Sequence, residues 1–332
     1  MARRLGLLTI ILALAQTAAC RAETTAAGPD APLVLERTIP LNGVTGRIDH
    51  LAVDAPHRRL FVAELGAGTV EAVDLASGAS LGRIAGLKEP QGLAYLPARD
   101  ELVVASGGDG SVRFYRASDL APMGAVALGD DADNARVDPR SGRVIVGYGS
   151  GGLAVIDAAS RVVAVRLPLP AHPESFQLDG ERALVNVPDA HRIIVGDLSR
   201  GRIVASWPAG YGWNFPMALD ATSGALAVVY RFPARMQVLD ARSGAGRADT
   251  AVCGDADDVF FDARRQRLYV SCGEGRVDVF AAGPQGLSAL AGVATRAGAR
   301  TSLFSPELDR LYVAARAGAG HEAAILVYRP RP

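Results

Sequence analysis

Two similar acidic stretches decide the fold. The sequence reads DADNARVD at residues 131–138 and DADDVFFD at residues 255–262, 124 positions further along the chain. Aligning the rest of the chain on the last Asp of each stretch gives seven landmarks at intervals of 41 to 43 residues. These landmarks are Asp54, Leu96, Asp138, Asp179, Asp220, Asp262 and Ser305. An internal repeat of about 42 residues therefore organises the chain.

Each copy of the repeat contains short apolar runs of the kind found in β-strands. One run begins about six residues after the landmark, as in LFVA at 60–63 and LYVS at 268–271, and a second follows, as in GLAVID at 152–157. Gly, Pro, Asp and Ser separate the runs, which indicates strands joined by tight turns. A period near 40 residues with about four strands is typical of a β-propeller blade.

Segments from the two ends of the chain together supply the four strands of the last blade. The last copy stops after three strands, at AAILVYRP (323–330), whereas the spare apolar run LVLERTIPL (33–41) precedes the first landmark. Pairing these two segments removes an exposed sheet edge. We therefore predict an all-β fold, a seven-bladed β-propeller of four-stranded blades closed by its N-terminal strand, as a single domain over residues 33–330. A pair of β-sandwiches is the alternative, but it does not explain the constant spacing.

Several of these segments resemble a known family. LYVA (311–314), LYVS, VDL (73–75), VLD (238–240) and the 42-residue spacing are similar to the YVTN-type β-propeller repeat family. PQGLAY (90–95), NFPMALD (214–220) and GARTSLFSPELDRLYVA (298–314) resemble exported bacterial members of that family. The resemblance runs from about residue 34 to residue 329. It implies the propeller fold, and it carries no catalytic residues over to this chain.

The first 22 residues have the pattern of an export signal. Arg3 and Arg4 precede the apolar run LGLLTIILALA (5–15), and small residues follow it. Two cleavage alternatives stay open: Cys20 becomes the lipid-modified first residue of a bacterial lipoprotein, although Thr17 stands where Leu is usual, or cleavage follows Ala19 or Ala22. Residues 23–32 are then a flexible tether. We expect a periplasmic protein, or one anchored to the outer face of a bacterial membrane only through a lipid at Cys20.

Charge and cysteine content argue against several kinds of partner and site. The chain carries 35 basic and 35 acidic residues, which argues against a nucleic-acid partner or an anionic membrane surface. Besides Cys20 there are Cys253 and Cys272, and export would allow them to form a disulfide, the alternative being two buried thiols. No CxxC or HxxxH motif occurs, so a cysteine-based zinc site or a c-type haem is not expected. We expect a monomer.

The repeat also predicts which side chains gather at one end of the ring. In a propeller, the loops that lead into the innermost strands share one face with the loops that join the second and third strands of each blade, and binding sites favour such loops. The position five residues before each landmark is held by Asp49, Gln91, Asp133, Glu174, Phe215, Asp257 and Arg300. So many carboxylates in one mouth favour raised pKa values, a bound cation, or a cationic or polyhydroxyl ligand. The alternative is that they bond nearby backbone amides as structural turn residues.

The position four residues before each landmark and the loops of the same face add further candidates. The predicted ligand-binding residues are Asp49, His50, Glu64, Gln91, Asp133, Asn134, Tyr148, His172, Glu174, Asn186, Arg231, Asp257, Asp258 and Arg300. We also expect Asp258 to lie opposite Cys272 in its hairpin. A Cys253–Cys272 bridge would then order Asp257 and Asp258.

The sequence leaves two functions open. The regular blades and the lack of a catalytic signature favour an exported binding protein, without assigned catalysis, for an unidentified small molecule or an exported protein. The alternative is a metal-dependent lactonase-like hydrolase, in which Asn134, Glu174 and Asp258 hold a divalent ion, Ca²⁺ or Mg²⁺, and His50 or a second carboxylate acts as base. A redox subunit similar to the amine dehydrogenase propeller has little support, because Trp207 and Trp213 are the only tryptophans.

Overall fold

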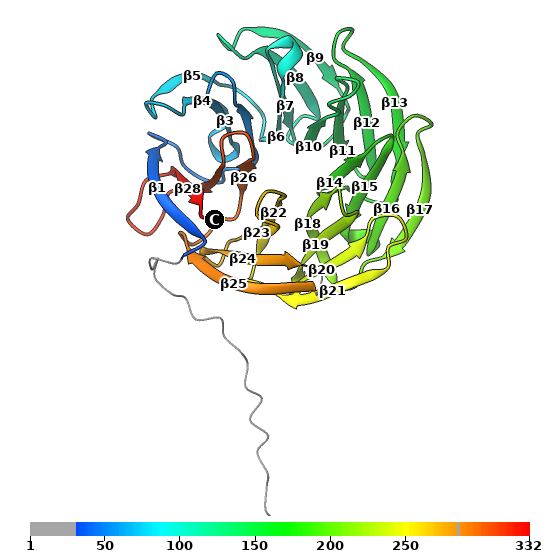
Figure 1. The fold of residues 1–332 in the computed structure, drawn as a ribbon. Helices are drawn as coiled ribbons and strands as arrows, with labels where there is room; N and C mark the ends of the chain where they lie inside the picture. Colours follow the sequence, from blue (N-terminus) through cyan, green and yellow to red (C-terminus); the bar gives the residue numbers. More distant parts are fainter. Residues whose placement is uncertain (1–30, 284–285) are drawn as a thin grey trace, which may run out of the picture.

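The computed structural model describes residues 31–283 and 286–332, which form seven four-stranded antiparallel sheets in a ring (Figure 1). The predicted export signal at residues 1–22, with Cys20, and most of the predicted tether lie outside the described residues. Helix in the described part is limited to three short 3₁₀ turns, η1 (Leu65–Ala67), η2 (Pro97–Arg99) and η3 (Pro188–Ala190). None of the described helices is long and apolar enough to cross a membrane.

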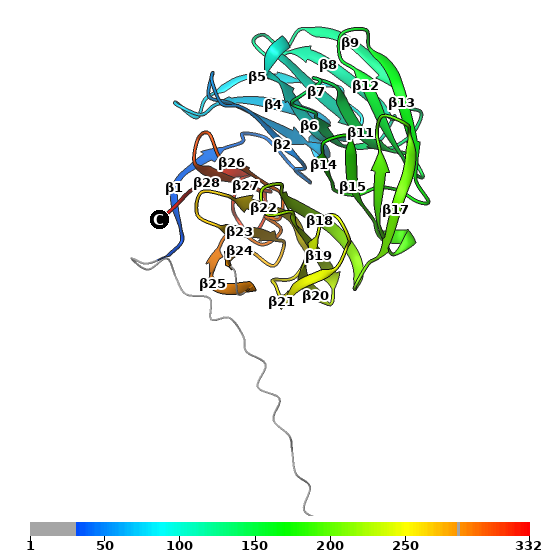
Figure 2. The same cartoon turned by 45° about the vertical axis from the view of Figure 1, so that its right-hand side comes forward.

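Each sheet is one blade. In blades 1 to 6 the four strands follow one another along the chain from the central axis to the rim (Figures 1 and 2). Blades 1 to 3 consist of β2 (Leu51–Asp54), β3 (Arg59–Glu64), β4 (Thr69–Asp74), β5 (Ser80–Ile84), β6 (Pro90–Leu96), β7 (Glu101–Ser106), β8 (Ser111–Arg116), β9 (Pro122–Ala127), β10 (Ala132–Val137), β11 (Val144–Tyr148), β12 (Gly152–Asp157) and β13 (Val162–Pro168). Blades 4 to 6 consist of β14 (Phe176–Asp179), β15 (Arg182–Val187), β16 (Arg192–Asp197), β17 (Arg202–Pro208), β18 (Gly212–Asp220), β19 (Ala225–Phe232), β20 (Ala234–Asp240), β21 (Gly246–Ala251), β22 (Ala256–Asp262), β23 (Arg267–Cys272), β24 (Arg276–Gly283) and β25 (Gly286–Ala294).

Blade 7 is built from both ends of the chain. Its inner strands are β26 (Ser302–Ser305), β27 (Arg310–Ala315) and β28 (Ala324–Pro330), and its outermost strand is β1 (Leu33–Pro40). β1 and β28 are antiparallel, with Leu33 opposite Pro330 and Pro40 opposite Ala324. The predicted seven four-stranded blades are thus confirmed, and the blade 7 sheet has the composition expected for closure by the N-terminal strand.

The repeated landmark lies where each innermost strand ends. Six of the seven innermost strands end on the landmark residue, and β10 ends one residue before Asp138. The carboxylate of Asp262 accepts hydrogen bonds from the backbone N–H groups of Arg264 and Arg265, each 3.1 Å long. Asp220 accepts one from the N–H of Thr222 at 3.0 Å. The landmark aspartates therefore recur because they stabilise the turn into the second strand.

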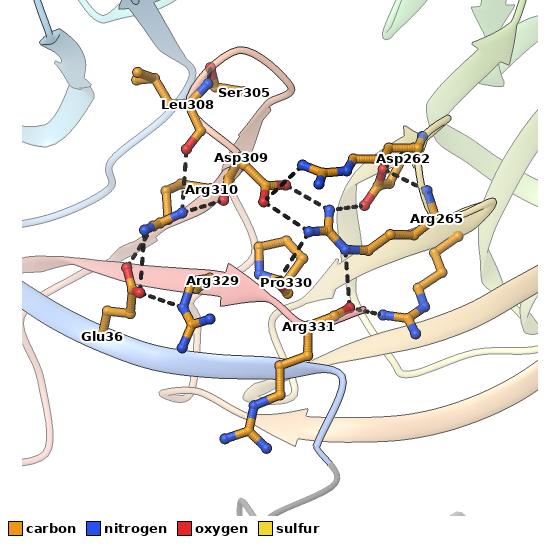
Figure 3. A network of polar contacts seen from close by, with 12 residues as sticks. Glu36, Asp262, Arg265, Ser305, Leu308, Asp309, Arg310, Arg329, Pro330 and Arg331 are labelled. Atoms are coloured by element: carbon orange, nitrogen blue, oxygen red, sulfur yellow. Dashed lines mark hydrogen bonds and ion pairs between the residues drawn. The ribbon is translucent and has the colours of Figure 1, made fainter.

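A polar network joins blade 6 to the closing blade (Figure 3). The Arg265 guanidinium donates to both carboxylate oxygens of Asp309, at 2.6 and 2.8 Å, to Asp262 at 3.0 Å, and to the carbonyl of Arg331 at 3.0 Å. Beside it, Glu36 of β1 accepts hydrogen bonds at 2.6 Å from the guanidinium groups of two arginines in blade 7, Arg310 and Arg329. Both ends of the described chain are tied to the ring here.

The hydrophobic core lies between neighbouring blades. One cluster joins Ala52 and Phe61 of blade 1 to Leu93 and Leu102 of blade 2. Another joins Tyr269 of blade 6 to residues of blade 7 that include Leu33, Leu311 and Tyr328. Because apolar side chains fill these contacts, the ring is a rigid support for the loops at its ends.

Candidate functional site at the channel mouth

A polar cavity of about 310 Å³ lies at one end of the ring, and every blade contributes to it. Most of its lining residues lie at the beginning of an innermost strand or in the loop before it. The lining residues are Arg47, Asp49, His50, Gln91, Asp131, Asp133, Asn134, His172, Glu174, Ser175, Phe215, Arg231, Asp257, Asp258 and Arg300. We call this cavity the mouth.

Most of the predicted site residues meet in the mouth. The structure brings together Asp49, His50, Gln91, Asp133, Asn134, His172, Glu174, Arg231, Asp257, Asp258 and Arg300. The other three, Glu64, Tyr148 and Asn186, do not line it, which corrects the prediction for them. Their side chains contact other residues of the blades.

Each of the three excluded side chains has a structural role. Glu64 is fully buried and accepts a hydrogen bond from Thr69 in its own hairpin. Asn186 is also buried, and its amide donates to the carbonyl of Phe215 at 2.9 Å. The Tyr148 ring lies 5.2 Å from the guanidinium carbon of Arg166. All three lie at or next to the end of a second strand, where successive side chains point to opposite faces, and they do not line the mouth.

β-bulges orient several of the lining residues. The strand register shifts between Pro90 and Leu93, between Ala132 and Ala135, between Asn214 and Met217, and between Ala256 and Asp258. In each case the shift includes a residue of the mouth. A bulge places an extra residue in one strand and changes where its side chains point. The recurring bulges are therefore a local device for turning polar side chains towards the axis.

One bulge corrects a predicted pairing. Asp258 lies opposite Ser271, and Cys272 lies opposite Ala256, so Asp258 does not face Cys272 as we had expected. The extra residue at Asp257 shifts the register by one position. A constant-spacing argument cannot detect this shift, because the bulge leaves the number of residues per repeat unchanged.

Cys253 and Cys272 form a disulfide, as the sequence indicated, with their Cα atoms 5.8 Å apart. Cys253 lies in the loop before β22, and its backbone N–H donates to Asp278 at 2.8 Å. Cys272 ends β23 and pairs with Ala256, the residue before Asp257. The bridge therefore ties the loop that precedes the acidic residues of blade 6 to the next strand of the same blade.

Two histidines lie among the carboxylates on one side of the mouth. His50 Nε2 is 4.0 Å from Asp49 and 3.9 Å from Asp133. His172 Nε2 is 3.8 Å from Asp133, while its Nδ1 is 3.5 Å from Asp131 and donates to the carbonyl of Gly149 at 2.6 Å. Asp133, which is almost fully buried, thus lies between two imidazoles.

Arginines neutralise a different subset of the acids. Arg47 pairs with Asp49 at 2.8 Å. Arg300 contacts Asp257 at 2.9 Å and Asp255 at 2.7 Å. Arg231 also pairs with Asp257, and its guanidinium carbon lies 3.9 Å from the centre of the Phe215 ring, a cation–π contact. Asp49 and Asp257 therefore have fixed cationic partners.

Four carboxyl groups of the mouth hold their protons unusually tightly, and one of them is Asp131, whose pKa is raised by burial. Burial raises the pKa of Asp49 to about 6 and that of Asp258 to about 7. Burial and the nearby Asp133 raise the pKa of Glu174 to about 8. Burial alone would lower the pKa of His172. Its contacts with Asp133, the Gly149 carbonyl and Asp131 have the larger effect and raise the pKa to about 9. Near neutral pH the mouth thus mixes neutral carboxyl groups with a charged imidazole.

Four lining residues were not among the predicted candidates. Phe215 and Ser175 occupy positions that the repeat had marked, and Asp131 lies in the acidic stretch that revealed the repeat. Each could have been found by including every side chain near a marked position. Arg47 lies outside those positions, in the loop before β2, and the repeat gives no signal for it.

Comparison with solved structures gives a coarse class. Comparisons with protein-family models and with curated protein sequences give no match. One similar solved structure is a chain of the Mitotic Checkpoint Complex, with a TM-score of 0.77 and 14% identity, covering 100% of this chain and 99% of that chain. A second is that of the RRP9 WD40 repeats, with a TM-score of 0.78 and 11% identity, covering 94% of this chain and 100% of that one.

The protein has a WD40-like seven-bladed propeller fold. At these identities the likeness concerns the fold alone, and the finer resemblance to YVTN-type repeats stays a prediction. A shared propeller does not determine what the mouth binds, because propellers carry many functions on the same scaffold. The function has to be argued from the site.

The predicted divalent-metal site also stays a prediction. In the described part of the chain, one group of three His, Cys, Asp or Glu side chains has ligand atoms all within 4.8 Å of one another: Asp54, His57 and Asp100. It lies outside the mouth, and Arg59 already occupies it, with nitrogens 2.6 Å from Asp54 and 2.5 Å from Asp100. A guanidinium in this position supplies the positive charge that the two carboxylates require.

Proposed function

We propose that this propeller is a binding protein whose mouth takes a small cationic ligand. The mouth is polar, and its side chains come from all seven blades, so a bound molecule would be surrounded on every side. Its size of about 310 Å³ suits a small molecule. A partner protein would instead use the broad face of the ring. Export, which would place this binding outside the cytoplasm, remains part of the proposal.

The observation that carries the proposal is that Glu174 lies in the mouth without a cationic partner in the part of the chain that the structure describes. Its carboxyl group lies in the mouth, and among the described residues no Arg, Lys or His nitrogen lies within 4.0 Å of it. Burial and Asp133 raise its pKa to about 8, and the charges of His172 and Arg231 offset this rise only in part. A ligand cation beside Glu174 would supply the missing charge and allow the carboxylate to ionise.

Binding of a cationic probe tests the proposal. Propylguanidine is suitable because the guanidinium group stays charged throughout the accessible pH range. We expect isothermal titration calorimetry at pH 8 to show one binding site per chain. Glu174→Gln should weaken binding about tenfold, the effect of losing one charge-assisted hydrogen bond.

Glu322→Gln is the matched control, because Glu322 is exposed and does not line the mouth. This variant should bind the probe like the wild type. Absence of binding to the wild type, or equal binding by the Glu174→Gln variant, would contradict the proposal.

A further inference from the structure

A second cavity adjoins the mouth, and most of its charged lining residues are arginines. Its volume is about 100 Å³, and its charged lining residues are Arg47, Arg300, Arg316 and Asp255. Arg47 and Arg300 line both cavities, so the two cavities are neighbours on either side of these side chains. The side cavity is lined by three arginines and one carboxylate, whereas the mouth is lined by six carboxyl groups and three arginines.

Arg316 is the side-cavity arginine with an available guanidinium. Arg47 is paired with Asp49 at 2.8 Å, and Arg300 is paired with Asp255 and Asp257 at 2.7 and 2.9 Å. In the described part of the chain, no carboxylate lies within 4.0 Å of Arg316, which is exposed.

Gly298 makes room for this arginine. A Cβ atom at Gly298 would collide with the Arg316 guanidinium, so the absence of a side chain lets Arg316 lie over the backbone there. Gly298 also has a φ of +80°, which glycine adopts without strain. The local backbone therefore accommodates Arg316 at the edge of the side cavity.

We propose that the mouth and the side cavity together bind one dipolar ligand, with its cationic group beside Glu174 and its acid group against Arg316. This inference rests on the proposed function, since it adds an anionic group to the same cationic ligand. A guanidinium matches a carboxylate with two parallel hydrogen bonds, which makes Arg316 suited to a carboxylic acid. The class of ligand is then a small zwitterion, such as an amino acid or a guanidino acid.

A series of matched probes measures the contribution of each charged group of the ligand to affinity. The series consists of propylguanidine, butyrate, and ω-guanidino acids with two, four and six carbons in the acid chain, titrated into the full chain at pH 8. We expect at least one guanidino acid to bind about tenfold more tightly than propylguanidine, as one added charge-assisted contact allows. Butyrate, which lacks the cation, should bind more weakly than either.

Arg316→Gln should remove the advantage of the guanidino acid and should not weaken propylguanidine binding, because it removes a positive charge near the bound cation. Arg202→Gln, at an exposed position on β17 in blade 4, is the control and should change neither affinity. Equal affinities for propylguanidine and every guanidino acid, or an advantage that survives Arg316→Gln, would overturn the dipolar ligand and leave the cation site intact. Absence of propylguanidine binding would instead overturn the proposed function itself.

Discussion

The carboxylate of Asp258 accepts a hydrogen bond of 2.7 Å from the backbone N–H of Ser302, across the boundary between blades 6 and 7. Ser302 is held from a second side as well, because its hydroxyl lies 2.8 Å from that of Ser271. An acidic residue of the mouth thus also joins two blades. A mutation of such an acid therefore changes both the charge of the mouth and the contact between two blades, and the two effects must be measured separately.

Substitutions at Asp258 can make that separation. Asp258→Asn keeps an oxygen that can accept the Ser302 hydrogen bond and removes the charge, whereas Asp258→Ala removes both. Both substitutions also remove the cost of ionising Asp258 at pH 8, because burial raises its pKa to about 7, so the informative comparison is between the two variants. We expect the free energy of unfolding of Asp258→Ala to be about 1–2 kcal/mol below that of Asp258→Asn, the range for a hydrogen bond to a partly charged acceptor. Urea denaturation measures both, and equal values for the two variants would show that the hydrogen bond is not the stabilising element.

Glu174 should make stability depend on pH in a direction opposite to that of a salt-bridged acid. Its pKa is raised from 4.5 to about 8, so between these values the folded protein holds a proton that the unfolded chain has released. Stability therefore falls as the pH rises through this window. Glu174→Gln removes this cost, and we expect its melting temperature to exceed that of the wild type by a few degrees at pH 8.5 and to match it at pH 4.5.

The exposed Glu322→Gln variant serves as the control for that experiment, with no expected change at either pH. Thermal unfolding followed by circular dichroism is sufficient. A difference between the Glu174→Gln variant and the wild type that is the same at both pH values would contradict the raised pKa.

The disulfide should be a main source of stability in blade 6. Cys253 and Cys272 are 19 residues apart in the sequence, and closing a loop of that size stabilises a protein by about 3 kcal/mol. We expect the double variant Cys253→Ser with Cys272→Ser to lose about 2–4 kcal/mol in urea denaturation. If the bridge also orders Asp257 and Asp258, as the sequence led us to expect, propylguanidine binding should weaken too. An unchanged free energy of unfolding would remove the stabilising role.

Arg265 should matter far more than its neighbour Arg264. The side chain of Arg265 is buried between Asp262 and Asp309, whereas that of Arg264 is 77% exposed and lies 3.7 Å from Asp309. Arg265→Ala leaves two carboxylates of adjacent blades without their shared cation, and we expect a loss of about 3 kcal/mol. Arg264→Ala should cost at most about 0.5 kcal/mol. Similar losses in the two variants would contradict the role assigned to the network in Figure 3.

The sequence predicted the architecture because spacing alone determines it. Landmarks such as Asp262 recur for a local reason, the turn that follows each innermost strand, so their count gives the number of blades. The spare segment at residues 33–41 could be assigned to blade 7 because that blade lacked one strand. Both inferences use only the order and length of segments, which a sequence states directly.

Side-chain direction was harder to predict than position. Glu64 and Asn186 were expected in loops at the mouth but lie in strands, with their side chains buried. The bulge at Asp257 places Asp258 opposite Ser271 and not opposite Cys272. Bulges depend on local backbone geometry that repeat spacing does not encode. Arg47 lies in the loop before β2, outside the positions that the repeat marks, so alignment of the copies could not identify it.

The pH dependence of cation binding tests the central claim most directly. Propylguanidine keeps its charge, so any change in its affinity reports on the protein. Glu174 and Asp258, whose pKa values are raised to about 8 and about 7, are mostly protonated at pH 6 and mostly ionised at pH 8.5, while His172 changes little below its pKa of about 9. Titration calorimetry of the wild type should show affinity rising about tenfold or more between these pH values, with a smaller rise for Glu174→Gln. An affinity that is the same at both pH values, or that falls as the pH rises, would contradict a mouth built to receive a cation.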